Sequence, residues 1–154
     1  MSFNKAYIYL KKHGLEKNIM KFTQSSATVK DAADAIKCKE GEIAKTICFI
    51  IDEKPILIVA AGDTKIDNAK YKLEFQTKAK MVDPIQVENL IGHPIGGVCP
   101  FGINDDVDVY LDESLKRFRK VYAACGSADS AVCLSIDELE KASNNKKWID
   151  VCKL

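Results

Sequence analysis

The 154-residue sequence lacks a charge excess, a long apolar run and an apolar leader. Its 23 lysines and arginines nearly balance 22 aspartates and glutamates, whereas a dedicated duplex-DNA binder carries a dominant basic footprint. The longest apolar runs, Ile47 to Ile51 and Pro55 to Ala61, are strand-sized and too short to span a membrane. Residues 1–12 lack the apolar core of a signal peptide. We therefore expect a cytoplasmic protein with neither a membrane nor duplex DNA as partner.

Metal and cofactor motifs are also missing. None of the six cysteines forms a CxxC pair, and cytosolic thiols stay reduced. Cys48, Cys133 and Cys152 stand in apolar runs, where a free cysteine acts as a small hydrophobe. The glycines at 92, 96 and 97 match neither a P-loop, since no Gly-Lys-Ser/Thr follows, nor a dinucleotide fingerprint. We expect no metal and no cofactor.

What is present is typical of one α+β domain over residues 1–154. The chain is 47% hydrophobic and 29% charged, the balance of a globular protein. Thr28 followed by Asp31 resembles a capping box that opens a helix burying Ala32, Ala33, Ala35 and Ile36. Hydrophobic periodicity and turn residues predict further helices over 3–13, 67–75, 83–90 and 136–142, a helical turn over 113–116, and strands over 19–24, 46–51, 56–61, 78–82, 107–111, 119–124, 131–135 and 148–151, the second and third as a hairpin.

Residues 91–102 (IGHPIGGVCPFG) form the most informative segment. Four glycines and two prolines exclude a helix, while Ile91, Ile95, Val98 and Phe101 call for burial. We expect a shaped loop pinned to the core. Such loops often hold a ligand with backbone N–H groups, but a tight connection between two core elements has the same composition. Composition alone leaves both interpretations open.

Three side chains are candidates for chemistry. Lys45 begins an apolar strand, so its ammonium either snorkels to solvent or points into a pocket as a fixed positive charge. His93, inside the loop, could donate a hydrogen bond or transfer a proton, although no carboxylate partner lies near it in sequence. Cys99 could act as a nucleophile with His93 as its base, but its place between Val98 and Pro100 favours a packing role.

Taken together, the segments resemble a known family. In family order they are Thr28–Ala33, Glu42–Thr46, Gly92–Gly102, Tyr110–Leu115 and Ala124–Ser127. The chain is similar over roughly residues 20–151 to the small aminoacyl-tRNA deacylases of the YbaK/EbsC type, which share a domain with the editing insertion of bacterial prolyl-tRNA synthetase. Each segment is weak evidence alone, and their order and spacing make the likeness specific.

The resemblance implies a curved mixed β-sheet surrounded by helices, with a central pocket. It implies hydrolysis of the ester that joins a wrong amino acid (Ala, Cys, Ser or Thr) to the 3′ end of tRNA, usually tRNA for proline. The aminoacylated tRNA is the expected partner and prolyl-tRNA synthetase a candidate partner. Lys45, Gly96 and Gly97 match catalytic positions, and the substrate-binding positions are Lys45, His93, Gly96, Gly97, Val98, Cys99, Pro100, Asp112 and Gly126. For Asp112 and Gly126 the resemblance is equally consistent with a structural role.

This chemistry needs no side-chain nucleophile. Ester hydrolysis builds negative charge on the carbonyl oxygen, which backbone N–H groups of a glycine loop and one ammonium can stabilise while water attacks. Two alternatives stay open: a non-catalytic module that binds aminoacyl-tRNA or a nucleotide, and a domain with a vestigial pocket. The intact loop and Lys45 disfavour the second.

Overall fold

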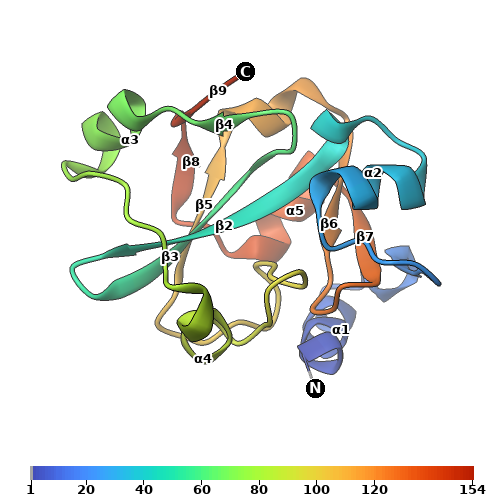
Figure 1. Ribbon diagram of the computed structural model, residues 1–154. Helices are drawn as coiled ribbons and strands as arrows, with labels where there is room; N and C mark the ends of the chain where they lie inside the picture. Colours follow the sequence, from blue (N-terminus) through green and yellow to red (C-terminus); the bar gives the residue numbers. More distant parts are fainter. Residues whose placement is uncertain (1) are drawn as a thin grey trace.

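A mixed seven-stranded β-sheet forms the centre of the computed structural model, which describes residues 2–154 (Figure 1). Its strands are β1 (Ile19–Lys21), β2 (Ile43–Ile51), β3 (Lys54–Ala61), β5 (Asp108–Asp112), β6 (Lys120–Ala124), β7 (Ser130–Ser135) and β8 (Lys147–Ile149). They lie in the order β1-β7-β6-β2-β3-β5-β8. The strands β4 (Lys65–Ile66) and β9 (Cys152–Lys153) form a separate antiparallel pair. The expected α+β fold with a mixed sheet is confirmed.

Helices cover both faces of the sheet. They are α1 (Ser2–Lys12), α2 (Val29–Ile36), α3 (Asn68–Phe75), α4 (Val87–Ile91) and α5 (Ile136–Ser143), with 3₁₀ turns at Glu16–Asn18, Glu40–Glu42, Pro84–Gln86 and Glu113–Arg117. Helices α1, α4 and α5 bury apolar side chains in the main core, with Leu57 and Val121 of the sheet. On the opposite face, α3 packs against Ile58 and α2 packs against Ile43. A cavity lies between α2, the segment that leads into α4, and the sheet.

Capping residues set the starts of the helices. The hydroxyl of Thr28 accepts a hydrogen bond from the Asp31 N–H at 3.0 Å, which fixes the first turn of α2. Ser135 and Glu138 form a complete capping box at the start of α5. Both starts agree with the sequence prediction. Within α2, Ala32 and Ala33 are buried as expected, whereas Ala35 and Ile36 are only partly buried.

A tight hairpin joins β2 to β3, as the sequence predicts. Asp52 and Glu53 form its two-residue turn with φ of 50° and 66°, the backbone that matches the twist of a β-ribbon. Pro55 lies inside β3, opposite Ile50, and not in the turn. The β2–β3 pairing runs from Ala44 to Ile51 and forms the longest ladder of the sheet.

Some local predictions were wrong. The strand expected over residues 78–82 is a single bridge between Phe49 and Met81, because only two backbone hydrogen bonds tie this segment to β2. The first strand ends at Lys21, well before Gln24. Strands β4 and β9 were not predicted, since each is only two residues long. Among residues 2–154, no helix has the length and apolar character needed to cross a membrane.

Candidate functional site

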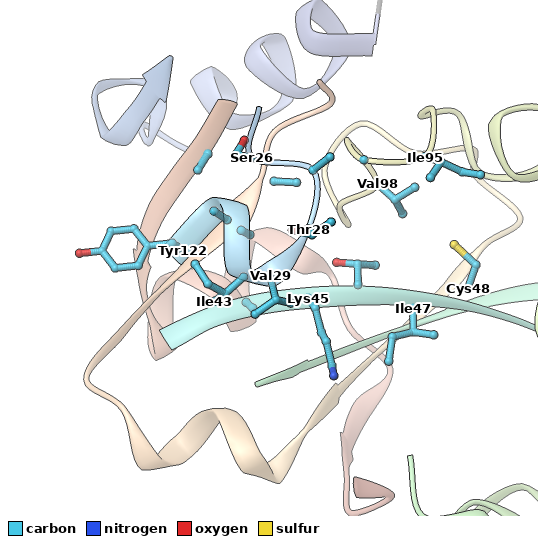
Figure 2. Close-up of a pocket in the computed structure, with 18 of the residues that line it drawn as sticks. Ser26, Thr28, Val29, Ile43, Lys45, Ile47, Cys48, Ile95, Val98 and Tyr122 are labelled. Carbon is cyan, nitrogen blue, oxygen red and sulfur yellow. The ribbon is translucent and has the colours of Figure 1, made fainter. Parts of the chain in front are cut away.

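A cavity of about 430 Å³ opens between α2, β2 and the 92–102 loop (Figure 2). Its lining is mainly aliphatic, and Lys45 is the one lining residue of the described chain that is charged at neutral pH. The lining comes from residues far apart in the sequence: Ser26–Val29, Ala32 and Ile36; Ile43–Cys48; Met81, Val82, Pro84 and Val87; Ile95, Gly96 and Val98; and Tyr122–Ala124, Ser130 and Ala131.

The cavity wraps around one edge of β2. Strand β6 pairs with β2 only at Ile43 and Ala44, and the next contact on this edge is the bridge at Phe49. Between them, within residues 2–154, the edge carries no neighbouring strand. Consecutive residues of a strand point to opposite faces, so the open edge explains why every residue from Lys45 to Cys48 lines the cavity.

The 92–102 loop is a closed, core-anchored structure. Gly92 ends α4 with φ of 110°, and the amide of Asn104 donates to Ile91 across the base of the loop. The His93 ring donates from Nε2 to the Phe101 carbonyl at 2.6 Å. Phe101 and Ile91 are fully buried. The expectation of a shaped loop pinned to the core is confirmed, except that Ile95 is 62% exposed at the cavity mouth and Val98 is only partly buried.

The two central glycines of this loop have different surroundings. Gly96 lines the cavity with φ of 92°, and a Cβ there would lie 3.2 Å from the Ala27 side chain. Gly97 faces away from the cavity lining, toward the turn between β6 and β7. A Cβ on Gly97 would lie 2.5 Å from backbone atoms of Gly126 and Ser127, and its carbonyl accepts the Gly126 N–H at 2.9 Å. Gly96 thus shapes the cavity, whereas Gly97 permits close packing behind it.

Lys45 reaches the cavity from the face of β2 that lies opposite the loop residue Val98. In Figure 2 its side chain and that of Ile47 extend from one side of the strand, while Val98 and Cys48 lie on the other. The Lys45 ammonium donates to the backbone carbonyl of Thr64. Burial lowers the pKa of Lys45 from its ordinary value, an effect that Cys152 and Asp63 oppose. The lysine is therefore a partly desolvated cation held beside the cavity, and does not snorkel freely into solvent.

Other predicted site residues lie behind the cavity wall and not in its lining. His93 and Cys99 are fully buried within the loop, and Pro100 packs beside them. Burial lowers the pKa of His93 and raises that of the Cys99 thiol, so neither group is charged at neutral pH. These properties give no support to a proton-transfer role for His93 or to a thiolate nucleophile at Cys99.

Asp112 and Gly126 have structural surroundings as well. The buried carboxylate of Asp112 accepts the N–H groups of Ser114 and Val151, both at 2.9 Å. Gly126 has φ of 85°, and a Cβ there would lie 2.5 Å from the Ser2 carbonyl oxygen. Direct substrate contact by Asp112 or Gly126 therefore has no support in the cavity lining, and both residues hold segments around it.

Sequence reasoning missed several lining residues. Thr46 and Tyr122 come from two strands, Met81 from the segment before α4, and Ser26 and Ser130 from loop and strand positions. The sequence around an individual strand residue does not show whether that residue lines a cavity, because its exposure depends on where β6 diverges from β2. One hint was available, since Thr46 is the only hydroxyl residue within the apolar run of β2.

The described residues contain no cluster of three or more His, Cys, Asp or Glu side chains that could hold a metal ion. The cavity hydroxyls of Ser26 and Thr28 are bonded to the Ala128 carbonyl and the Asp31 amide. What the arrangement offers a ligand is an apolar enclosure, one ammonium, the Thr46 hydroxyl and main-chain groups.

Comparison with known proteins connects this site to a family. The model of the aminoacyl-tRNA editing domain matches residues 23–142, which include both β2 and the 92–102 loop. The chain is 47% identical over 154 residues to the uncharacterized protein YwhH of Bacillus subtilis, covering 99% of this chain and 98% of that protein.

Longer proteins and solved structures agree with the match. The chain is 30% identical over 114 residues to proline–tRNA ligase of Listeria welshimeri; the match covers 71% of this chain and 20% of the ligase, so the chain spans about a fifth of that enzyme. The structure of a candidate trans-editing enzyme for prolyl tRNA synthetase superposes with a TM-score of 0.88 at 26% identity, covering 99% of this chain and 98% of the other. The hypothetical protein APE2540 gives a TM-score of 0.86 at 25% identity, covering 97% and 99%.

Proposed function

The chain belongs to the aminoacyl-tRNA editing domain family, and we propose that it hydrolyses the ester between a wrong amino acid and the 3′ end of a tRNA. The observation that carries this proposal is a cavity that combines the Lys45 cation with the glycine loop. The cavity opens at the surface, so a flexible single-stranded 3′ end can enter it, as single-stranded RNA ends enter protein sites elsewhere.

The reaction requires charge stabilisation more than a nucleophile. Water adds to the ester carbonyl carbon, negative charge builds on the carbonyl oxygen, and the bond to the ribose 3′ oxygen then breaks. That oxygen takes up the proton that the water gives up. The Lys45 ammonium and the backbone of the Gly96–Pro100 segment where it lines the cavity, at Gly96 and Val98, are the groups that we propose stabilise the charge. Because Lys45 and the loop residue Val98 line the cavity from opposite faces of β2, the substrate must lie across the open edge.

The substrate that we propose is tRNA for proline carrying Ala, Cys, Ser or Thr. The matches to proline–tRNA ligases and to a candidate trans-editing enzyme for prolyl tRNA synthetase support this choice of tRNA. We propose that the protein acts on tRNA released from prolyl-tRNA synthetase, which makes the synthetase a candidate partner.

A deacylation panel tests the proposal. The protein is incubated with tRNA for proline and tRNA for alanine, each charged with Ala, Cys, Ser, Thr or Pro, and release of the amino acid is measured. We expect hydrolysis of at least one mischarged tRNA for proline. Binding of the tRNA without hydrolysis in any combination would replace the deacylase with a non-catalytic binding module.

Lys45 is tested with a matched lysine variant. Lys45→Ala removes the cation of the cavity lining, and we expect kcat to fall about 100-fold, as for the loss of one charge-stabilising donor. Lys30→Ala removes an exposed lysine of α2 that does not line the cavity and should keep its activity. Turnover by Lys45→Ala at the rate of Lys30→Ala, with both variants folded, would refute the proposed role.

A further inference from the structure

The open edge of β2 exposes main-chain groups inside the cavity. Cys48 accepts from the Val82 N–H at 3.1 Å and Ile50 donates to the Lys80 carbonyl at 2.9 Å, both on this edge. Main-chain groups of alternate residues point to the same edge of a strand. The N–H and C=O of Thr46 therefore face the edge as well.

Thr46 falls in a gap of one residue between two pairings. Ala44, two residues earlier, is paired with β6 at Ala123, and Cys48, two residues later, has its carbonyl bonded to Val82. Within residues 2–154, neither main-chain group of Thr46 on this edge has a hydrogen-bond partner. Two unpaired main-chain groups on one strand edge can pair with a ligand that has a matching donor and acceptor.

We infer that the aminoacyl group of the substrate pairs with Thr46 as a one-residue β-strand. An aminoacyl group has one amino group and one carbonyl, spaced as in a single peptide residue. In the hydrogen-bonded pair of an antiparallel sheet, two residues exchange both of their N–H and C=O bonds. Here the Thr46 carbonyl accepts from the α-amino group, and the Thr46 N–H donates to the ester carbonyl oxygen. This inference rests on the proposed function, and it adds how the site holds the amino acid.

The pairing also sets the direction of the amino acid side chain. Residues opposite each other in an antiparallel pair project to the same face. The face of Thr46 is that of Cys48 and Val98, because Lys45 and Ile47 occupy the other face (Figure 2). The amino acid side chain thus enters the part of the cavity formed by the glycine loop, and the ester carbonyl lies at the edge, between the loop and Lys45.

Amide resonances provide a direct test. The probe is 3′-deoxy-3′-(L-alanylamino)adenosine, in which a stable amide replaces the ester and the α-amino group is retained. We expect titration of the ¹⁵N-labelled protein to move the Thr46 amide proton downfield, as a new hydrogen bond does. The amide of Leu57, within the fully paired β3, is the internal reference. Saturable binding that leaves the Thr46 amide unmoved would overturn the pairing.

A pair of variants tests the same bond in catalysis. Thr46→Pro removes the N–H, and because this N–H faces an open edge, proline breaks no sheet hydrogen bond. Thr46→Val keeps the N–H and removes only the hydroxyl. We expect kcat/KM of Thr46→Pro to lie about tenfold below that of Thr46→Val, the effect of one net hydrogen bond. Equal kcat/KM in two folded variants would overturn the inference.

The two proposals fail separately. If the wild type hydrolyses mischarged tRNA but the Thr46 amide does not respond to the probe, the deacylase stands and the pairing is refuted. If the probe moves the Thr46 amide but the wild type hydrolyses nothing in the panel, the pairing stands and the deacylase is refuted. Should Thr46→Pro not fold, the amide titration of the wild type decides.

Discussion

Gly97→Ala provides a test of how the glycine loop is positioned. Gly97 does not have a positive φ, so alanine brings no backbone strain there. Its Cβ would instead lie 2.5 Å from both the Gly126 carbonyl carbon and the Ser127 nitrogen, and must reach at least 3.4 Å for ordinary contact. Both atoms are backbone, and the Gly126 N–H is bonded to the Gly97 carbonyl. The loop and the β6–β7 turn therefore have to separate.

We expect this separation to cost stability and activity together. Overpacking of a tight contact costs about 1–3 kcal/mol in the free energy of unfolding. Gly96, the adjacent residue, lines the cavity and moves with the loop. A misplacement on the order of 1 Å in a catalytic group lowers the rate by about 100-fold, so deacylation by Gly97→Ala should fall by a factor of this size while the protein stays folded.

Urea unfolding and the deacylation assay measure the two effects. Gly14→Ala is the control: Gly14 has φ of 72°, and no atom of the described residues lies within 4 Å of the point that a Cβ would occupy. Alanine there introduces strain alone, about 1 kcal/mol, at a residue outside the cavity lining. Gly14→Ala should lose stability and keep its activity. Wild-type stability and wild-type deacylation in Gly97→Ala would refute the close contact and its role in positioning Gly96.

Two further predictions concern buried groups of the loop. Burial lowers the pKa of His93, so below the ordinary pKa the unfolded chain binds a proton that the folded chain does not. As the pH is lowered from about 6.5 toward the folded pKa, the free energy of unfolding should therefore decrease by up to about 1.4 kcal/mol per pH unit. Urea unfolding of the wild type and His93→Gln over this range should show the dependence weakened in the variant, and equal slopes would contradict it. Cys99→Ala should keep most of the deacylation rate, because the thiol is fully buried and its pKa is raised; loss of activity in a folded variant would restore the nucleophile hypothesis.

Strong local patterns predicted much of the fold. The β2–β3 hairpin follows from two apolar runs around a turn, and the starts of α2 and α5 follow from Thr28 and Ser135. The segment at 78–82 was predicted as a strand, yet only Met81 bridges β2. Strand formation there depends on a partner, which local sequence does not specify.

The site also contains residues that the sequence predicted and residues that it did not. Lys45 and Gly96 were predictable because a lysine in an apolar run and a glycine-rich loop are unusual in sequence, and both line the cavity. His93 and Asp112 were chosen by resemblance, and their burial and hydrogen bonds place them behind the wall. Thr46 was missed because its importance comes from the absence of a neighbouring strand within residues 2–154, and the sequence of β2 does not encode where β6 diverges.

The divergence of β6 from β2 is the feature that joins the fold to its function. Full pairing of β6 with β2 would satisfy the Thr46 main chain but would close the cavity, because the lining of Lys45–Cys48 depends on the open edge. The sheet thus gives up hydrogen bonds at one position, and a ligand that restores them gains their free energy. The longer β2–β3 ladder, from Ala44 to Ile51, holds the strand rigid at its other edge. An unpaired residue on a rigid strand is a preorganised site, and preorganisation is what charge stabilisation of a reacting ester requires.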